Sequence, residues 1–120
     1  MLTISEVSRR SRVAASALRF YEARGLISSV RAQPTARRHY HPDVLARIEF
    51  IQRAQQVGLS LGEIGDCLAL LPRSTPAAKS DWTAVARAVT PRLDRQVAVI
   101  EELRAQLRSD WMSRSLAARA

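Results

Sequence analysis

The sequence contains a single cysteine, a single lysine and no long apolar run. The lone cysteine and the lack of an apolar run each exclude classes of protein. Cys67 cannot form a disulfide within the chain, which is typical of proteins from a reducing compartment. No apolar stretch approaches the roughly 18 residues of a membrane span. The start of the chain lacks the charged and apolar regions of a signal peptide. We therefore expect a cytoplasmic bacterial protein that makes no membrane contact.

The residue sets that carry catalysis or hold metals are also missing from the sequence pattern. No nucleophile–base–acid set and no phosphate-binding loop is recognisable. His39 and His41 have no cysteine or carboxylate partners at ligand spacing. We therefore expect no enzyme, no metal site and no cofactor.

Positive charge is abundant, and it is unevenly distributed. The chain of 120 residues carries 19 basic and 11 acidic side chains, and 18 of the basic residues are arginine. Residues 1–60 hold 10 basic and 4 acidic groups, whereas residues 61–120 hold 9 and 7. A biased genome explains arginine in place of lysine but not this asymmetry. A basic half is typical of a module that binds a polyanion such as DNA.

A helix-turn-helix is predicted over about residues 4–24. Thr3 and Glu6 form a Thr-x-x-Glu capping pattern, which starts a short helix. A turn at 11–13 separates it from a second helix over about 14–24. In a helix-turn-helix the second helix enters the DNA major groove.

The second helix supplies the first candidate DNA contacts. We expect Leu18 and Phe20 to face inward and Ser16, Arg19 and Tyr21 to face outward. Arg19 can donate two hydrogen bonds to a guanine or clamp a phosphate. The hydroxyl of Tyr21 can donate to a phosphate, and Ser16 lies near the start of the helix.

A small hairpin wing is predicted over about residues 27–41, where the helical period stops. Arg31 lies on one side of the hairpin, and Arg37 and Arg38 lie on the other. These arginines are candidate contacts to the DNA backbone. Tyr40 is expected to pack the wing against the rest of the domain.

The remaining chain is predicted to be helical, which gives a mainly α fold. The predicted division is a winged-helix DNA-binding domain over 1–72 with further helices at about 43–56 and 60–71, a linker over 73–79, a long dimerisation helix over 80–111, and a short tail over 112–120. Pro91 either begins a second helix or kinks a single one.

The long helix has the pattern of an antiparallel coiled coil. Its apolar residues at heptad and companion positions are Val89, Leu93, Ile100, Leu103 and Leu107. A lone amphipathic helix of this length has no core of its own to cover. It therefore needs a partner, and a second copy of the same chain is the most economical one.

Several blocks resemble the MerR family of transcription regulators over essentially the whole chain. They are Ile-Ser-Glu-Val at 4–7, Ala-Leu-Arg-Phe-Tyr-Glu at 17–22, Gly-Leu-Ile at 25–27, Arg-Arg-His-Tyr at 37–40 and Gly-Leu-Ser-Leu-Gly-Glu-Ile at 58–64. The resemblance implies a homodimer that binds a pseudo-palindromic promoter operator, bends and untwists the DNA, and works with RNA polymerase. It also implies that Arg37 and Arg38 grip the DNA backbone. Arg12 departs from the pattern, because the family usually has glycine there, and the turn either tolerates strain or has another shape.

Within the family, the chain is most similar to the SoxR branch of redox sensors. That branch holds a [2Fe–2S] cluster with four cysteines. At the first three of those positions this sequence has Asp110, Ser113 and Ser115, and it ends about where the fourth falls. Four thiolates are the usual ligands of such a cluster. We therefore expect no iron–sulfur cluster.

The effector is left open by the sequence. One option is a small ligand at the dimer joint near Trp82 and Trp111; a second is oxidation of Cys67; a third is no effector at all. A buried structural role for Cys67 is favoured over a redox switch, because nothing near it in sequence lowers its pKa. The alternative to a regulator is an architectural, excisionase-like protein that bends DNA without an effector.

Overall fold

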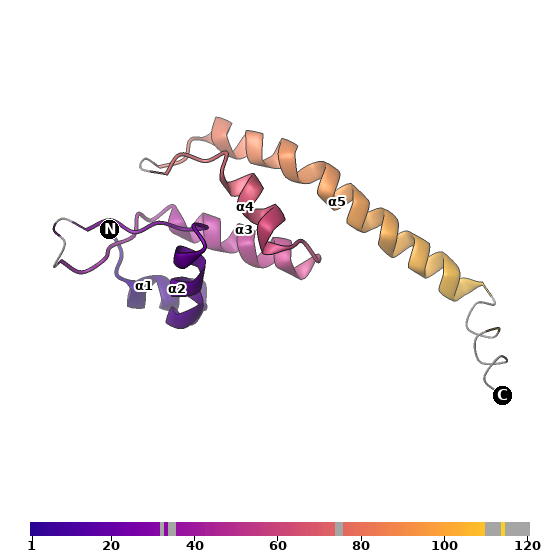
Figure 1. The fold of residues 1–120 in the computed structure, drawn as a ribbon, viewed down its shortest axis with the longest axis horizontal. Helices are drawn as coiled ribbons and strands as arrows, with labels where there is room; N and C mark the ends of the chain where they lie inside the picture. The colour runs from indigo at the N-terminus through magenta and orange to yellow at the C-terminus, as the bar shows by residue number, and fades with distance from the viewer. Residues whose placement is uncertain (32, 34–35, 74–75, 110–113, 115–120) are drawn as a thin grey trace.

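The computed structural model describes residues 1–31, 33, 36–73, 76–109 and 114. Within these residues the α-helices are α1 Ile4–Ser11, α2 Ala15–Ala23, α3 Val44–Gln56, α4 Leu61–Leu68 and α5 Lys79–Arg108. Helices α1 to α4 form one group, and α5 extends away from it as a long rod (Figure 1). The mainly helical fold expected from the sequence is therefore confirmed.

Two of the helices begin at side-chain caps of the Ser/Thr-x-x-Glu pattern, of which the cap at Thr3 was predicted above. The Thr3 hydroxyl accepts a hydrogen bond from the Glu6 amide at 3.2 Å, and α1 follows directly. The Ser60 hydroxyl accepts from the Glu63 amide at 3.1 Å at the start of α4. Each cap satisfies an amide that otherwise has no partner within the helix.

Arg12 occupies the turn between α1 and α2 with a left-handed backbone, at φ 60° and ψ 30°. The turn thus keeps the shape that glycine usually provides, and an arginine adopts it. Among the described residues, Arg12 is the only one other than glycine with a positive φ. Its side chain is exposed beside the helix-turn-helix.

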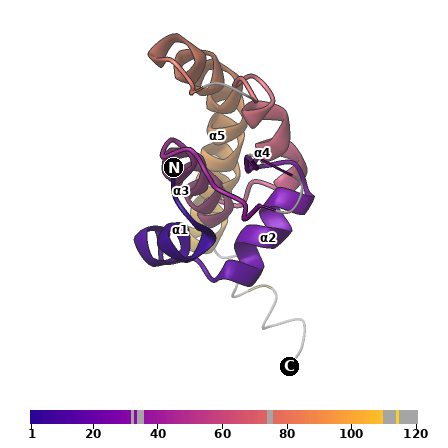
Figure 2. The ribbon, with the colours of Figure 1, turned by 90° about the vertical axis from the view of Figure 1, so that its left-hand side faces the viewer.

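The core lies between α1, α2, α3 and α4. Val7, Leu18, Ile48, Ile51 and Ile64 are all fully buried there. They come from all four helices, so the core fixes the orientation of α2 relative to the rest. Figure 2 shows α1 and α2 side by side, with α5 behind them.

The predicted wing is present as a hairpin held by isolated bridges, without an extended strand among the described residues. Val30 and His39 exchange backbone hydrogen bonds of 2.7 and 2.8 Å. Leu2 and Tyr40 pair in the same way, at 2.7 Å in both directions. The segment before α1 therefore adds to the wing, which the sequence did not indicate. Tyr40 is buried, as expected.

Helix α5 runs through Pro91 as a single helix, so Pro91 does not begin a second helix. Its first half belongs to the core, because Val85 and Val89 are buried against it and Leu93 is partly buried. A side-chain contact fixes its middle, where Gln96 Nε2 donates to the Val57 carbonyl at 2.7 Å.

The residues predicted to form the dimer interface therefore fall into two groups, one covered by the chain's own core and one exposed. The expectation that Val89 faces a partner is wrong, because the chain's own core covers it, and Leu93 retains only part of its surface for a partner. The later positions Ile100, Leu103 and Leu107 are each about half exposed, at 52%, 50% and 49%.

Candidate nucleic-acid interface

The outer face of α2 carries Ser16 and Arg19, which are both exposed as predicted. Leu18 is fully buried and Tyr21, three residues later, is 8% exposed. Residues three apart lie on the same face of a helix, so Leu18 and Tyr21 together define the inner face. Ser16 and Arg19 consequently project away from the core.

The predicted orientations of Phe20 and Tyr21 are wrong. Tyr21 packs into the core, and its hydroxyl donates to Gln55 Oε1 on α3 at 3.3 Å. Phe20 is 47% exposed, and the Arg24 guanidinium lies 5.2 Å from its ring centroid. A tyrosine suits the edge of a core because its ring is buried while its hydroxyl finds a polar partner.

Glu22, also on α2, joins the helix to the wing. Its carboxylate accepts hydrogen bonds of 2.6 Å from the Ser29 hydroxyl and 2.6 Å from the Tyr40 hydroxyl. Arg38 donates to the same carboxylate at 3.1 Å and forms an ion pair with it. One acidic side chain thus connects α2 to both sides of the hairpin.

These contacts set the charge state of Glu22 and Tyr40. Burial raises the pKa of Glu22, but the hydrogen bonds from Ser29 and Tyr40 and the charges of Arg38 and Arg31 outweigh it, so its pKa lies below the ordinary value. Burial and the neighbouring Glu22 raise the pKa of Tyr40 to about 12. Glu22 is therefore ionised and Tyr40 neutral at physiological pH.

The four predicted DNA-contacting arginines converge on one hollow of about 680 Å³. They are Arg19 from α2 and Arg31, Arg37 and Arg38 from the wing. Residues 3–5, at the start of α1, complete its lining with Tyr40. A concave surface lined by arginines, beside the positive end of a helix dipole, attracts phosphate groups.

Two predicted site residues lie outside this hollow. Ser16 is exposed on α2 but does not line it, and Tyr21 is buried. Sequence reasoning also missed two contributors, Glu22 and Ser29. The only available signal was a carboxylate directly after the aromatic pair of α2, and its partners are 7 to 18 residues away.

Cys67 is fully buried in α4. Burial raises the pKa of its thiol, although the charge of Arg92 acts in the opposite direction. Arg92 on α5 approaches the sulfur at 3.5 Å. A buried, protonated thiol is a poor nucleophile, which supports the structural role over the redox switch.

Of the two tryptophans suggested to line an effector pocket, the structure describes only Trp82. Trp82 is partly buried and packs edge-on against Phe50, with ring centroids 6.1 Å apart. Trp111 lies outside the described residues.

In the described part of the chain, no three His, Cys, Asp or Glu side chains come together as a metal site requires. None of the helices described there combines the length and apolar character needed to cross a membrane.

Comparison with known protein families identifies the family to which the chain belongs. Residues 2–71 match the MerR HTH family of regulatory proteins, and residues 45–109 match the MerR DNA-binding family. The chain belongs to the MerR family. It is accordingly a DNA-binding transcriptional regulator and not an enzyme.

Individual relatives agree with this assignment to the MerR family. An HTH-type transcriptional activator SoxR homolog from Chromobacterium violaceum is 44% identical over 108 residues, which cover 90% of this chain and 72% of that protein. A heavy metal-dependent transcription regulator from Rhizobium meliloti is 34% identical over 102 residues, covering 85% and 69%. Among solved structures, a putative MerR family regulator from Listeria monocytogenes superimposes with a TM-score of 0.63 at 25% identity, covering 99% of this chain and 92% of that one.

Proposed function

We propose that this MerR-family chain acts as a homodimer that recognises a pseudo-palindromic promoter operator. The observation that carries the proposal is the convergence of Arg19 with Arg31, Arg37 and Arg38 around one hollow. In this arrangement Arg19, with Ser16, reads base edges in the major groove. The wing arginines hold the backbone beside it. Tyr21 acts by fixing the orientation of α2 on α3.

The second half of α5 supports the dimer. Ile100, Leu103 and Leu107 fall at positions separated by three, four and seven residues, which align along one side of a helix. About half of each side chain is exposed in the single chain. Packing this face against the same face of a second, antiparallel copy covers these side chains and sets the separation of the two DNA-binding domains.

The proposed regulatory step is a deformation of the promoter. Two domains joined by a helical pair bind successive half-sites, and the DNA between them bends and untwists although no residue touches it. Deformation of this kind costs on the order of 1–6 kcal/mol, which the contacts at both half-sites offset. RNA polymerase then uses the deformed promoter in the cytoplasm. No iron–sulfur cluster takes part in this proposal.

A fluorescence-anisotropy titration tests the proposed operator binding. The full chain is titrated into duplexes taken from its own upstream region, with scrambled duplex as competitor, at two salt concentrations. We expect binding that survives the competitor and weakens with salt, because the arginines displace counterions from phosphates. Equal binding to both duplexes would instead favour an architectural DNA-bending protein.

A further inference from the structure

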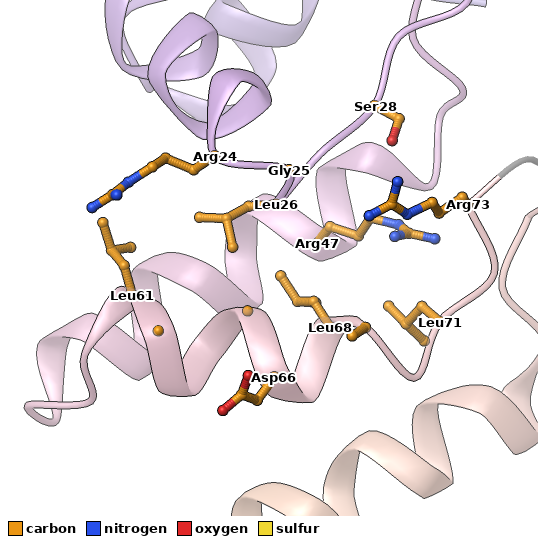
Figure 3. A pocket seen from close by; sticks show the side chains of 13 residues that line it. Arg24, Gly25, Leu26, Ser28, Arg47, Leu61, Asp66, Leu68, Leu71 and Arg73 are labelled. Atoms are coloured by element: carbon orange, nitrogen blue, oxygen red, sulfur yellow. The ribbon is translucent and has the colours of Figure 1, made fainter.

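A second concave region lies on the domain, apart from the arginine hollow. A pocket of about 540 Å³ opens between the end of α2, the segment after it and α4 (Figure 3). Its apolar lining consists of Leu26, Leu61, Leu68 and Leu71. A further hollow of about 520 Å³ shares Ser28, Arg47 and Arg73 with this pocket. Volumes of this size are ordinary for sites that bind small molecules.

Three arginines line the pocket, and their charges are poorly balanced within the chain. In the described part of the chain, neither Arg24 nor Arg73 forms an ion pair. Figure 3 shows Arg47 and Arg73 at one end of the pocket and Arg24 at the other, with leucines between them. The pocket therefore combines an apolar middle with cationic ends.

Arg47 is the most unusual of the three because it is 91% buried, with a relative exposure of 9%. Its Nη2 donates to the Pro72 carbonyl at 2.7 Å. Its carboxylate partner, Asp43 Oδ2, is 3.9 Å away and also accepts from the Ala77 amide at 3.1 Å. A buried cation with so distant a counterion gains from a closer anion.

The other carboxylate at the pocket does not supply that anion. Asp66 is 76% exposed at its side chain, and its closest cation is Arg92, 4.0 Å away on α5. In Figure 3 its carboxylate points away from Arg47 and Arg73. The end of the pocket that holds these two arginines thus keeps a positive potential.

We propose that this pocket binds a small amphipathic carboxylate. The carboxylate group lies at Arg47 and Arg73, where guanidinium groups can bind it through paired hydrogen bonds, and Ser28 adds a hydroxyl donor. The alkyl or aryl portion lies against the leucines. Because inorganic phosphate has no apolar portion, the leucine lining favours an organic acid over it.

The location of the pocket gives the ligand a means to act on the protein. The pocket contacts the end of α2 through Arg24 and the start of the linker to α5 through Arg73. An occupant therefore touches both the DNA-reading helix and the segment that leads to the dimerisation helix. Binding itself needs no DNA, so its failure and the failure of the proposed operator recognition are distinguishable.

Titration calorimetry and saturation-transfer NMR on the full chain without DNA test the site. The probes are octanoate and phenylacetate, and their neutral amides octanamide and phenylacetamide serve as matched controls. We expect saturable binding of at least one acid and about tenfold weaker binding of its amide, because the charge-assisted hydrogen bonds are lost. If neither acid binds at millimolar concentration, or if acid and amide bind equally, the proposal is wrong.

Two variants locate the binding on the protein. Arg73→Gln removes one cation, and Gly62→Leu fills the pocket, where an added Cβ meets only the Ser60 hydroxyl oxygen at an ordinary 3.8 Å. Both are expected to weaken acid binding about tenfold, whereas Arg87→Gln, on an exposed part of α5, leaves it unchanged. Circular dichroism confirms that each variant is folded. If both pocket variants bind the acid as well as the unaltered chain does, the assignment is wrong. It is also wrong if the chain binds no acid and Arg73→Gln lowers only the affinity for duplex DNA.

Discussion

The Tyr40 hydroxyl donates a 2.6 Å hydrogen bond to the carboxylate of Glu22, and this contact connects the base of the wing to α2. Tyr40 also pairs through its backbone with Leu2, ahead of α1. Helix, wing and N-terminal segment are thus connected at one point. The spacing between Arg19 on α2 and the wing arginines depends on that connection.

Replacement of Glu22 by glutamine is expected to loosen this connection. The amide keeps one acceptor oxygen but places an NH₂ donor where the wing already supplies donors. We expect the free energy of unfolding in urea to fall by about 1–3 kcal/mol, as for a broken buried hydrogen bond to a charged group. Glu49→Gln, which alters an exposed pair with Arg53, is the matched control and should change it by less than about 1 kcal/mol. Equal effects of the two variants would show that Glu22 has no special role.

The stability that Glu22 confers is expected to depend on pH. Its pKa in the folded chain lies below its ordinary value of 4.5. A lowered folded-state pKa stabilises the fold above the unfolded-state pKa, and this contribution disappears as the pH falls through the folded-state value. The difference in urea midpoint between the wild type and Glu22→Gln should therefore be constant near neutral pH and shrink below about pH 4.5. A difference that grows on acidification would contradict the assigned direction.

Arg19→Ala is expected to weaken operator binding by about 1–3 kcal/mol and to relax base preference at one position in each half-site. Anisotropy titrations on operator variants and on scrambled duplex measure both effects. Arg95→Ala, on an exposed part of α5, controls for the loss of one positive charge. An equal loss on operator and scrambled duplex would assign Arg19 to the backbone instead of a base.

Leu103→Asp is expected to produce monomers in analytical ultracentrifugation, because it places a charge in the exposed apolar face of α5. Ala98→Asp is the matched control. Ala98 precedes Ile100 by two residues and so lies about 200° around the helix from it. Dimers that persist in Leu103→Asp, or that dissociate only in Ala98→Asp, would place the interface on another face.

Arg12→Gly is expected to stabilise the fold by up to about 1 kcal/mol. The left-handed backbone at φ 60° strains a residue with a Cβ, and glycine adopts it freely. Arg9→Gly, within α1, should destabilise the fold by about 1 kcal/mol and serves as the contrasting variant. Thermal unfolding followed by circular dichroism gives both changes, and destabilisation by both would mean that Arg12 makes a compensating contact.

Local signals carried most of the fold prediction. The Thr-x-x-Glu and Ser-x-x-Glu caps at Thr3 and Ser60 each act within a few residues, so the sequence alone was enough to locate the starts of α1 and α4. The orientations predicted for Phe20 and Tyr21 are reversed in the structure, because neighbouring residues of a helix differ in direction by only about 100°. Gln55, which accepts the hydrogen bond from Tyr21, lies 34 residues further along the chain.

The error at the site, where Glu22 was missed, and the error in the dimer interface, where Val89 was included, have the same physical origin. Glu22 gains its role from partners in the wing that no local pattern connects to it. Val89 fits a heptad equally well whether a second chain or its own core covers it, and only the packing of α5 on α4 shows which of the two applies. The predicted domain boundaries stay a prediction.

The hydrogen bond from Gln96 to Val57 marks the point where α5 leaves its own domain. The 12 residues from there to the end of the helix at Arg108 extend roughly 18 Å beyond this contact, at 1.5 Å per residue. A tilt of the helix by about 10° about this contact moves its far end by roughly 3 Å, close to the rise of one base pair. Any change at the contact between α5 and the end of α3 is therefore enlarged before it reaches the second copy.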